Sequence, residues 1–363
     1  MGEQGAALRG RLRGLLARGD NSTVRVCMRK TRPSATRAEY LAAFTEGAQA
    51  VGFNVVTMRE VNQFTSARKW ADKAREMACD FGVAWALSER MIAGFARLGA
   101  DVVVVELPFF REPFQRHHYC SLAFGGLNGY GINFFAANRS DDRLRRVFEP
   151  GLRIHPMRRG SGNGNGSGGV VGVRQDQPPV VLVVGQMYFD RSMFPIIRRY
   201  GRPRMWYTRA VTHINAALPS AKVVFRPHPQ DVLHAGWAPA GAVLQDGRVT
   251  TFEEAVASAW VVVTMNSNAA VDALLMGVPV VAVDPGSMAW PIASRTLAEV
   301  ADPYVPTEAL RRQWLAAMAY GQWSLDELRS GVAWQVGASV PYVLLIHWLL
   351  FGWFTLHQNT MRF

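Results

Sequence analysis

Two short stretches, FRPHP at residues 225–229 and VVVTMNSN at residues 261–268, each lead from an apolar run into polar residues. The second stretch continues into a predicted helix at 269–276, then Gly277, then another apolar run at 278–283. Strand, polar loop, helix, glycine and strand in this order are typical of a parallel α/β sheet, whose ligands lie at the carboxyl ends of the strands. The two polar ends are therefore the first candidates for a binding site.

The same alternation extends along most of the chain. Before residue 150, the apolar runs predict strands at 24–28, 53–58, 81–86 and 101–107 and helices at 38–51, 67–78 and 89–98. After residue 178, they predict strands at 180–184, 222–225, 260–264 and 279–283, with helices at 205–217, 251–258, 269–276, 307–319 and 325–331. The predicted fold class is α/β, with two Rossmann-like parallel-sheet domains facing a cleft.

Residues 158–178 interrupt this pattern, because the Gly-, Ser- and Asn-rich run at 158–169 cannot bury a core. This interruption suggests the following division: a basic N-terminal arm at 1–21, a first domain at 22–157, a linker or loop at 158–178, a second domain at 179–335 and a tail at 336–363. The tail contains an apolar run at 340–354, shorter than the ~20 residues of a spanning helix. A buried helix, an interfacial membrane or partner-binding helix and a true span all stay open for it.

The chain is strongly basic, with a formal net charge of +12 and a pI of about 10.2. The excess lies in three clusters of arginine and lysine, at 1–37, 139–159 and 191–209. Such clusters indicate a polyanionic partner, such as nucleic acid, anionic lipid or lipopolysaccharide, although a general use of arginine on the surface is the alternative.

Only three cysteines occur, widely spaced and without a CxxC pair. This pattern argues against a disulfide framework or a zinc site and favours a reducing, cytosolic setting. The first twenty residues hold no continuous apolar core, so they do not resemble a secretory signal. No GxGxxG follows a strand and no GxxxxGK[ST] occurs, which disfavours dinucleotide binding and P-loop chemistry.

Taken together, the two sheet halves and the pairing of RPHP at 226–229 with NSN at 266–268 resemble the GT-B glycosyltransferases. The His-Pro and Ser pairing is similar to that of bacterial sialyltransferases and Kdo-type capsule transferases, in which these motifs bind the nucleotide of the sugar donor. Three further features resemble glycosyltransferases of tailed phages: residues 319–334, residues 121–129, and Glu106 followed by Arg111. The resemblance covers roughly residues 22–335, and the apolar tail departs from it.

The resemblance implies a donor site in the second half. His228 lies between two prolines that fix its backbone, and it would contact the donor phosphate unless it only packs in a turn. Ser267 and Asn268 lie at a predicted helix start, where they either cap the helix or also bind phosphate. The other donor-binding candidates, each with a structural alternative, are Arg226, Asn266, Asp272, Gly185 and Gln186, with Tyr188 and Asp190 as weaker ones.

The general base for the acceptor hydroxyl is expected in the first half. Glu106 ends a buried strand, where a carboxylate is costly unless it is used or paired, and Glu89 ranks second. His117 and His118 are further candidates, and a structural pair of Glu106 with Arg111 is the alternative. The loop at 125–129, with Asn128, is either an acceptor loop or a set of tight turns.

No Asp-x-Asp occurs, so the divalent-metal motif of the other major glycosyltransferase fold is missing. We therefore expect a metal-independent enzyme without a cofactor, using a UDP- or CMP-sugar as co-substrate. The expected acceptor is a hydroxymethylated base in DNA, contacted by Arg9, Arg11, Arg13, Arg111, Asn128, Arg198, Arg199 and Arg202.

Three alternatives to this function stay open. The first is a capsule or lipopolysaccharide sugar transferase whose tail contacts the membrane. The second is a sugar-nucleotide epimerase or hydrolase on the same scaffold. The third is a nucleic-acid-binding protein without activity. The expected location is the cytoplasm or, for the first alternative, the membrane periphery.

Overall fold

A computed structural model describes residues 24–29, 35–59, 61, 64–86, 89–111, 114, 119–126, 128–131, 140–158, 178–231 and 236–338. The chain forms two compact units. Among the described residues, the first unit takes those within 24–126, 131–144 and 315–338, and the second takes those within 128–130 and 145–314. The predicted arm, most of the predicted linker, the tail beyond residue 338, His117 and His118 lie outside the described residues.

The first unit contains a six-stranded sheet in the order β11-β5-β4-β3-β1-β2. Its four predicted strands run parallel to one another: β1 (Arg25–Arg29), β2 (Asn54–Met58), β3 (Phe81–Trp85) and β4 (Asp101–Glu106). Two strands that were not predicted extend it in antiparallel pairing, β5 (Tyr119–Phe124) and β11 (Gln322–Ser324). The first sheet is therefore mixed.

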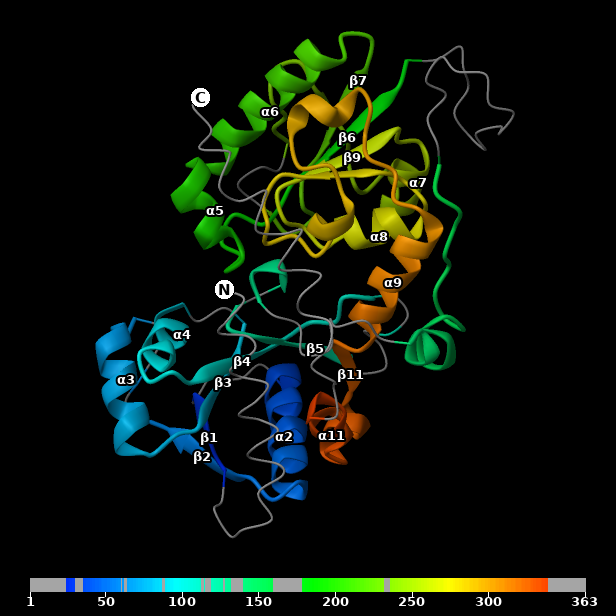
Figure 1. Cartoon of the computed structure of the whole chain (residues 1–363). Coiled ribbons are helices and arrows are strands. Elements are labelled where there is room, and N and C mark those ends of the chain that lie inside the picture. The colour runs from blue at the N-terminus through cyan, green and yellow to red at the C-terminus, as the bar shows by residue number, and fades with distance from the viewer. Residues whose placement is uncertain are drawn as a thin grey trace. The chain divides into compact units, whose positions relative to one another are not determined.

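Helices cover both faces of this sheet (Figure 1). Alternate side chains of each strand point to opposite faces, so Val26 and Met28 of β1 join one core and Cys27 joins the other. The core with Val26 also contains residues of α2 (Ala35–Ala50), α10 (Leu325–Arg329) and α11 (Val332–Ala338). The core with Cys27 contains residues of α3 (Ala67–Glu76) and α4 (Glu89–Ala96).

Cys27 and Cys79 form a disulfide, whereas the cysteine spacing argued against one. Their sequence separation of 52 conceals that they are close in the fold, because Cys79 follows α3 and returns to the sheet next to β1. Cys120 is free and buried.

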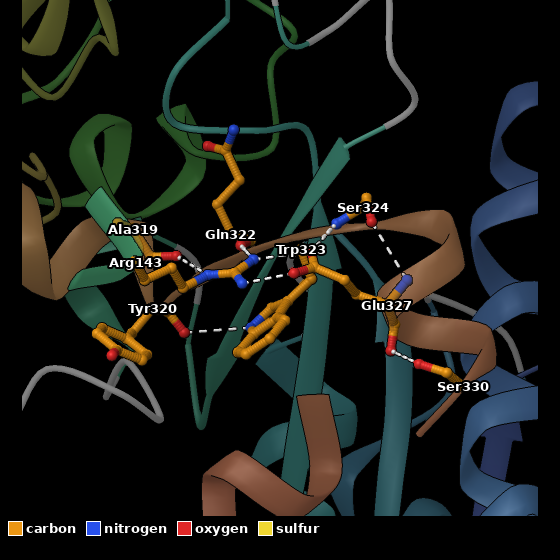
Figure 2. A network of polar contacts seen from close by, with 8 residues as sticks. All are labelled: Arg143, Ala319, Tyr320, Gln322, Trp323, Ser324, Glu327 and Ser330. Carbon is orange, nitrogen blue, oxygen red and sulfur yellow. Dashed lines mark hydrogen bonds and ion pairs between the residues drawn. The ribbon is translucent and has the colours of Figure 1, made fainter. Parts of the chain in front are cut away.

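An arginine clamp fastens the C-terminal segment to the first unit (Figure 2). Arg143 donates hydrogen bonds to the carbonyls of Ala319 and Gln322 at 2.8 Å each, and it forms an ion pair with Glu327 at 2.5 Å. Its guanidinium also lies 3.9 Å from the ring centroid of Trp323. Together with β11, this clamp places residues 315–338 in the first unit, whereas the sequence suggested the second domain for residues up to 335.

The second unit contains a five-stranded, all-parallel sheet in the order β10-β9-β6-β7-β8. Its strands are β6 (Val180–Val184), β7 (Lys222–Arg226), β8 (Val243–Leu244), β9 (Val261–Thr264) and β10 (Val280–Ala282). The short edge strand β8 was not predicted, because two residues are too few to show the pattern of apolar residues that marks a strand. The predicted parallel α/β class is confirmed in this unit.

Both faces of the second sheet are covered as well (Figure 1). One core joins Val181, Val183 and Phe225 to α5 (Met193–Tyr200) and α6 (Pro203–Ala217). The remaining helices of the unit are α7 (Phe252–Ala257), α8 (Ala269–Leu275) and most of α9 (Glu308–Ala319). Because buried strands have apolar residues on both faces, they read as the continuous Val runs from which they were predicted.

No helix within the described ranges is long and apolar enough to cross a membrane. The predicted apolar run at 340–354 lies outside those ranges. The start of the predicted tail at residue 336 falls inside α11, which packs on α2 and α10.

Candidate functional site at the carboxyl ends of the second sheet

The two motifs singled out from the sequence meet at one edge of the second sheet. The RPHP motif follows β7, the NSN motif follows β9, and β6 with Gly185 and Gln186 lies between them. Since all three strands are parallel, their carboxyl ends share this edge. The candidate donor-binding residues are therefore neighbours, as predicted from the parallel fold.

Gly185 allows the first two segments to approach closely. Its N–H donates to the carbonyl of Arg226 at 2.8 Å. A Cβ at Gly185 would lie 3.1 Å from the Cα of Pro227 and 3.3 Å from the amide nitrogen of His228. Any larger residue would push the loop after β6 away from the His-Pro motif.

A pair of buried amides forms the floor of this edge. The Gln186 side chain donates to Asn266 Oδ1 at 2.5 Å and accepts from the Asn266 backbone N–H at 3.3 Å. Asn266 in turn donates to the Ser192 carbonyl at 3.1 Å, and the Gln186 backbone N–H donates to the Tyr207 hydroxyl at 2.9 Å. Both side chains are thus engaged with protein groups, and their direct role is to tie β6 to β9.

His228 and Ser267 are half-buried above this floor. His228 Nδ1 accepts from the Gln230 N–H at 3.1 Å, so a neutral ring carries its proton on Nε2 and can donate there. The Ser267 hydroxyl oxygen accepts from the Ala269 N–H at 3.3 Å, which leaves its own proton to donate. These two donors suit an oxyanion such as a phosphate.

Arg226, two residues before His228, is engaged with protein groups. The residue is 9% exposed, and its guanidinium donates to Gln245 Oε1 and the Thr250 carbonyl, at 3.0 and 2.9 Å. Burial lowers the pKa of this guanidinium. Arg226 therefore holds the loop at 245–250, which is the structural alternative for this residue.

The helix after the NSN motif is short. α8 has seven residues, and its N-cap Asn268 makes no side-chain capping bond. Asp272 lies half-buried in the first turn of α8. Tyr188 is half-buried in the loop after β6, and Asp190 in the same loop accepts from the Ser192 N–H at 2.7 Å, so it shapes the start of α5.

In the first unit, the two candidate bases lie at one edge of the sheet. Glu106 is the last residue of β4, and Glu89 begins α4 just after β3, the strand paired with β4. Glu106 is half-buried, and its Oε1 accepts from the Leu107 N–H at 2.9 Å. Arg111 is exposed on the segment that follows β4.

Asn128 lies in a segment that belongs to the second unit, whereas the sequence placed it in the first domain. It begins a short 3-10 helix, Asn128–Tyr130, in which the Gly129 N–H donates to the Gly286 carbonyl at 2.9 Å. The loop at 125–129 therefore leaves the first unit after Gly126 and docks on the loop after β10.

The predicted acceptor-side arginines of the second half lie around α5 and α6. Arg198 and Arg199 are exposed in the last turn of α5, and Arg202 is the exposed N-cap residue of α6. No acidic residue occurs from Arg191 to Gln230.

Sequence reasoning missed Asp284, which follows β10 at the same edge and is fully buried. It accepts hydrogen bonds from the Tyr130 hydroxyl and the Gly286 N–H, and it pairs with Arg199. The signal was available, because a carboxylate directly after a buried apolar strand is the feature that singled out Glu106. Within the described ranges, no group of three His, Cys, Asp or Glu side chains is arranged to hold a metal ion.

Neither a protein-family model nor a curated protein matches the chain. Solved structures similar to it include the β-Kdo 2,7 transferase of KpsC from Thermosulfurimonas dismutans, with 14% identity over 85% of this chain and 98% of that one and a TM-score of 0.44. The β-Kdo 2,4 transferase of the same protein shares 11% identity over 82% and 91%, with a TM-score of 0.47. The glycosyltransferase SnogD from Streptomyces nogalater shares 14% identity over 87% and 100%, with a TM-score of 0.29.

Proposed function

We propose that the protein is a glycosyltransferase of the GT-B type that binds a nucleotide-sugar donor at the carboxyl edge of the second sheet. One observation carries the proposal: the RPHP and NSN motifs, which resemble the donor-binding motifs of His-Pro/Ser transferases, end the parallel strands β7 and β9 on either side of β6. His228 and Ser267 present donors suited to the donor phosphate, above a buried Gln186–Asn266 floor.

The base that removes the acceptor proton is Glu106 in this proposal, with Glu89 as the second choice. Both lie at the carboxyl edge of the first sheet, where ligands of parallel strands bind. We propose that side-chain donors, without a metal ion, stabilise the leaving nucleotide.

For the acceptor, we propose a polyanion that carries a hydroxyl group. A hydroxymethylated base in DNA is the first choice, and an anionic capsule or lipopolysaccharide glycan is the second. The acid-free stretch at 191–230, with the exposed Arg198 and Arg202, supports a polyanion of either kind.

A transfer assay tests this proposal. The full chain is incubated with UDP-sugars and CMP-sugars, including CMP-Kdo, and with DNA containing 5-hydroxymethylcytosine or an oligosaccharide acceptor. Nucleoside and glycan mass spectrometry then detect the added sugar. A sugar-sized mass gain on either acceptor supports the transferase, and its identity decides between the two acceptors. Failure to consume any donor would contradict it.

Glu106→Gln tests the proposed base. The substitution keeps the size of the side chain but removes its ability to take a proton, so kcat should fall about 100-fold or more. The donor KM should stay unchanged, because the donor lies on the other sheet. Glu89→Gln serves as the matched variant, and a loss in Glu89→Gln alone would move the role of base to Glu89.

A further inference from the structure

A second polar group lies beside the proposed donor site, around Asp284. This carboxylate has no exposed surface and is held by three donors: the Tyr130 hydroxyl, the Gly286 N–H at 2.8 Å and Arg199 at 3.1 Å. Burying a charge is costly unless it is paired and hydrogen-bonded, and here it is both. Burial, followed by the hydrogen bond and the charge of Asp284, raises the pKa of the Tyr130 hydroxyl, so Tyr130 remains a donor.

Two glycines bring Tyr130 to this carboxylate. A Cβ at Gly286 would lie 2.3 Å from the Tyr130 ring, and a Cβ at Gly129 would lie 2.3 Å from the Pro285 carbonyl oxygen. Only glycine at both positions lets the segment at 128–130 lie against the loop after β10. The contact with Asp284 thus depends on a segment that is distant in the sequence.

Arg199 differs from its partner in exposure. Its side chain is 50% exposed, although the carboxylate that it pairs with is fully buried. A guanidinium has five N–H donors, and Arg199 uses one of them on Asp284 and interacts with the Tyr200 hydroxyl. The buried carboxylate therefore fixes the direction of a guanidinium that still offers donors to solvent.

This group lies on the same edge as the His-Pro and Ser motifs. The Asp284 N–H donates to the Met265 carbonyl at 3.2 Å, directly before Asn266. The Asn266 side chain donates to the Ser192 carbonyl at the start of α5, the helix that carries Arg199. The segments after β10, β9 and β6 are thus joined by one buried hydrogen-bond network.

We propose that Arg199 is an anion-binding residue that contacts the phosphate of the nucleotide donor, and that Asp284 and Tyr130 position it. This inference rests on the proposed function and adds a residue to the donor site. A planar, fixed guanidinium binds two phosphate oxygens at once, which matches the charge that develops on the leaving nucleotide. Asp284 does not touch the ligand and acts through Arg199.

The test compares Arg199→Gln with Arg248→Gln. Arg248 also pairs with an aspartate, Asp246, but it is 90% exposed and follows β8, at the opposite end of the strand order from β10. Binding of inorganic diphosphate, UDP and CMP to the full chain is measured by calorimetry. We expect the Kd for a bound anion to rise at least tenfold in Arg199→Gln and to change less than twofold in Arg248→Gln.

Two further variants separate binding from folding. Arg199→Lys keeps a cation beside Asp284 but lacks the planar fork, so it should fold as the wild type and still bind the anion more weakly. Asp284→Asn keeps Arg199 but releases it, and should also raise the Kd. Circular dichroism of each variant confirms the fold.

The outcomes distinguish this inference from the proposed function. Binding by Arg199→Gln equal to that of the wild type, in a protein that turns over a donor, overturns the role of Arg199 and leaves the transferase intact. Arg199-dependent binding of diphosphate without turnover of any donor supports the anion site and contradicts the transferase. A wild type that binds none of the three probes overturns both.

Discussion

Two arginine–carboxylate pairs in this protein use the same chemistry with opposite exposure. In the first unit, Arg143 is 9% exposed and Glu327 is 24% exposed. In the second unit, the carboxylate of Asp284 is fully buried and Arg199 is 50% exposed. In the first pair, Arg143 donates to protein carbonyls and lies against a tryptophan ring. In the second pair, Arg199 keeps N–H donors at the surface, at the edge of a parallel sheet. The first pair therefore serves the fold, whereas our proposal assigns the second pair to a ligand.

The largest loss of stability is expected from Arg143→Ala. The change leaves the Glu327 carboxylate without its cation and the carbonyls of Ala319 and Gln322 without their donor. Breaking a buried pair in this way costs about 3 kcal/mol or more. Urea denaturation of the full chain, followed by circular dichroism, measures it, and binding of diphosphate at the second unit should be unaffected.

Arg75→Ala is the control for that experiment. Arg75 pairs with Asp72 at 3.2 Å, but both side chains are more than half exposed. Such surface pairs contribute about 0–1 kcal/mol, so this variant should unfold almost as the wild type does. Equal losses in Arg143→Ala and Arg75→Ala would show that the clamp is not what holds the C-terminal segment.

Asp284→Asn should cause the next largest loss of stability. It removes a charged acceptor of three hydrogen bonds, and bonds to charged groups contribute about 1.5–3 kcal/mol each to stability. Because Arg199 is half exposed and can return to water, we expect a loss of about 2 kcal/mol in urea denaturation. The comparison predicts a second consequence that Arg143→Ala lacks, namely weaker anion binding. Loss of stability with unchanged binding would make Asp284 a purely structural residue.

Tyr130→Phe should have a smaller effect. It deletes the hydroxyl that donates to Asp284, worth about 1 kcal/mol of stability. Because the pKa of Tyr130 is raised in the folded state, its contribution is complete below the ordinary value of 10.0 and is lost only in strong alkali. Absorbance at alkaline pH checks this: the folded wild type and Tyr130→Phe should give the same phenolate signal up to about pH 10.

The smallest effect concerns the pH dependence of the first pair. Burial acts to raise the pKa of Glu327, but the hydrogen bonds and charge of Arg143 outweigh it and hold the pKa below its ordinary value of 4.5. Its contribution to stability is therefore present above pH 4.5 and is lost as the pH falls through the lower folded value. Urea denaturation at several pH values between 6 and 3 should show that Glu327→Gln loses less stability with falling pH than the wild type does. An unchanged slope would mean that other carboxylates dominate.

The sheets of both units were predictable where strands are buried on both faces, as the valine runs at 102–105 and 180–184 show. The edge strand β11 was missed because it has three residues and pairs with β5, which lies far back in the sequence. The strand β5 was missed although it pairs with β4, which lies close to it in the sequence. α5 was missed as well, since Pro195 in its first turn interrupts a helical pattern. The disulfide was missed because the spacing of two cysteines in the sequence does not show whether the fold brings them together.

The candidate site was likewise predictable only in part. Its location was predictable, because polar residues at the carboxyl ends of parallel strands must share an edge. The partners of a long side chain were not predictable, since nothing in the sequence links Arg226 to the loop at 245–250. Asp284 and Tyr130 meet across 154 residues, through two glycines whose role appears only in three dimensions.

The most direct test of the account locates the nucleotide on the protein. Photoreactive analogues of UDP and CMP are crosslinked to the full chain, with unmodified nucleotide as competitor, and the labelled peptides are identified by mass spectrometry. The account predicts competed labelling of the segments after β6, β7 and β9, at 185–190, 226–231 and 265–268, and its loss in His228→Ala. Competed labelling confined to the first unit, or labelling that His228→Ala leaves unchanged, would contradict it.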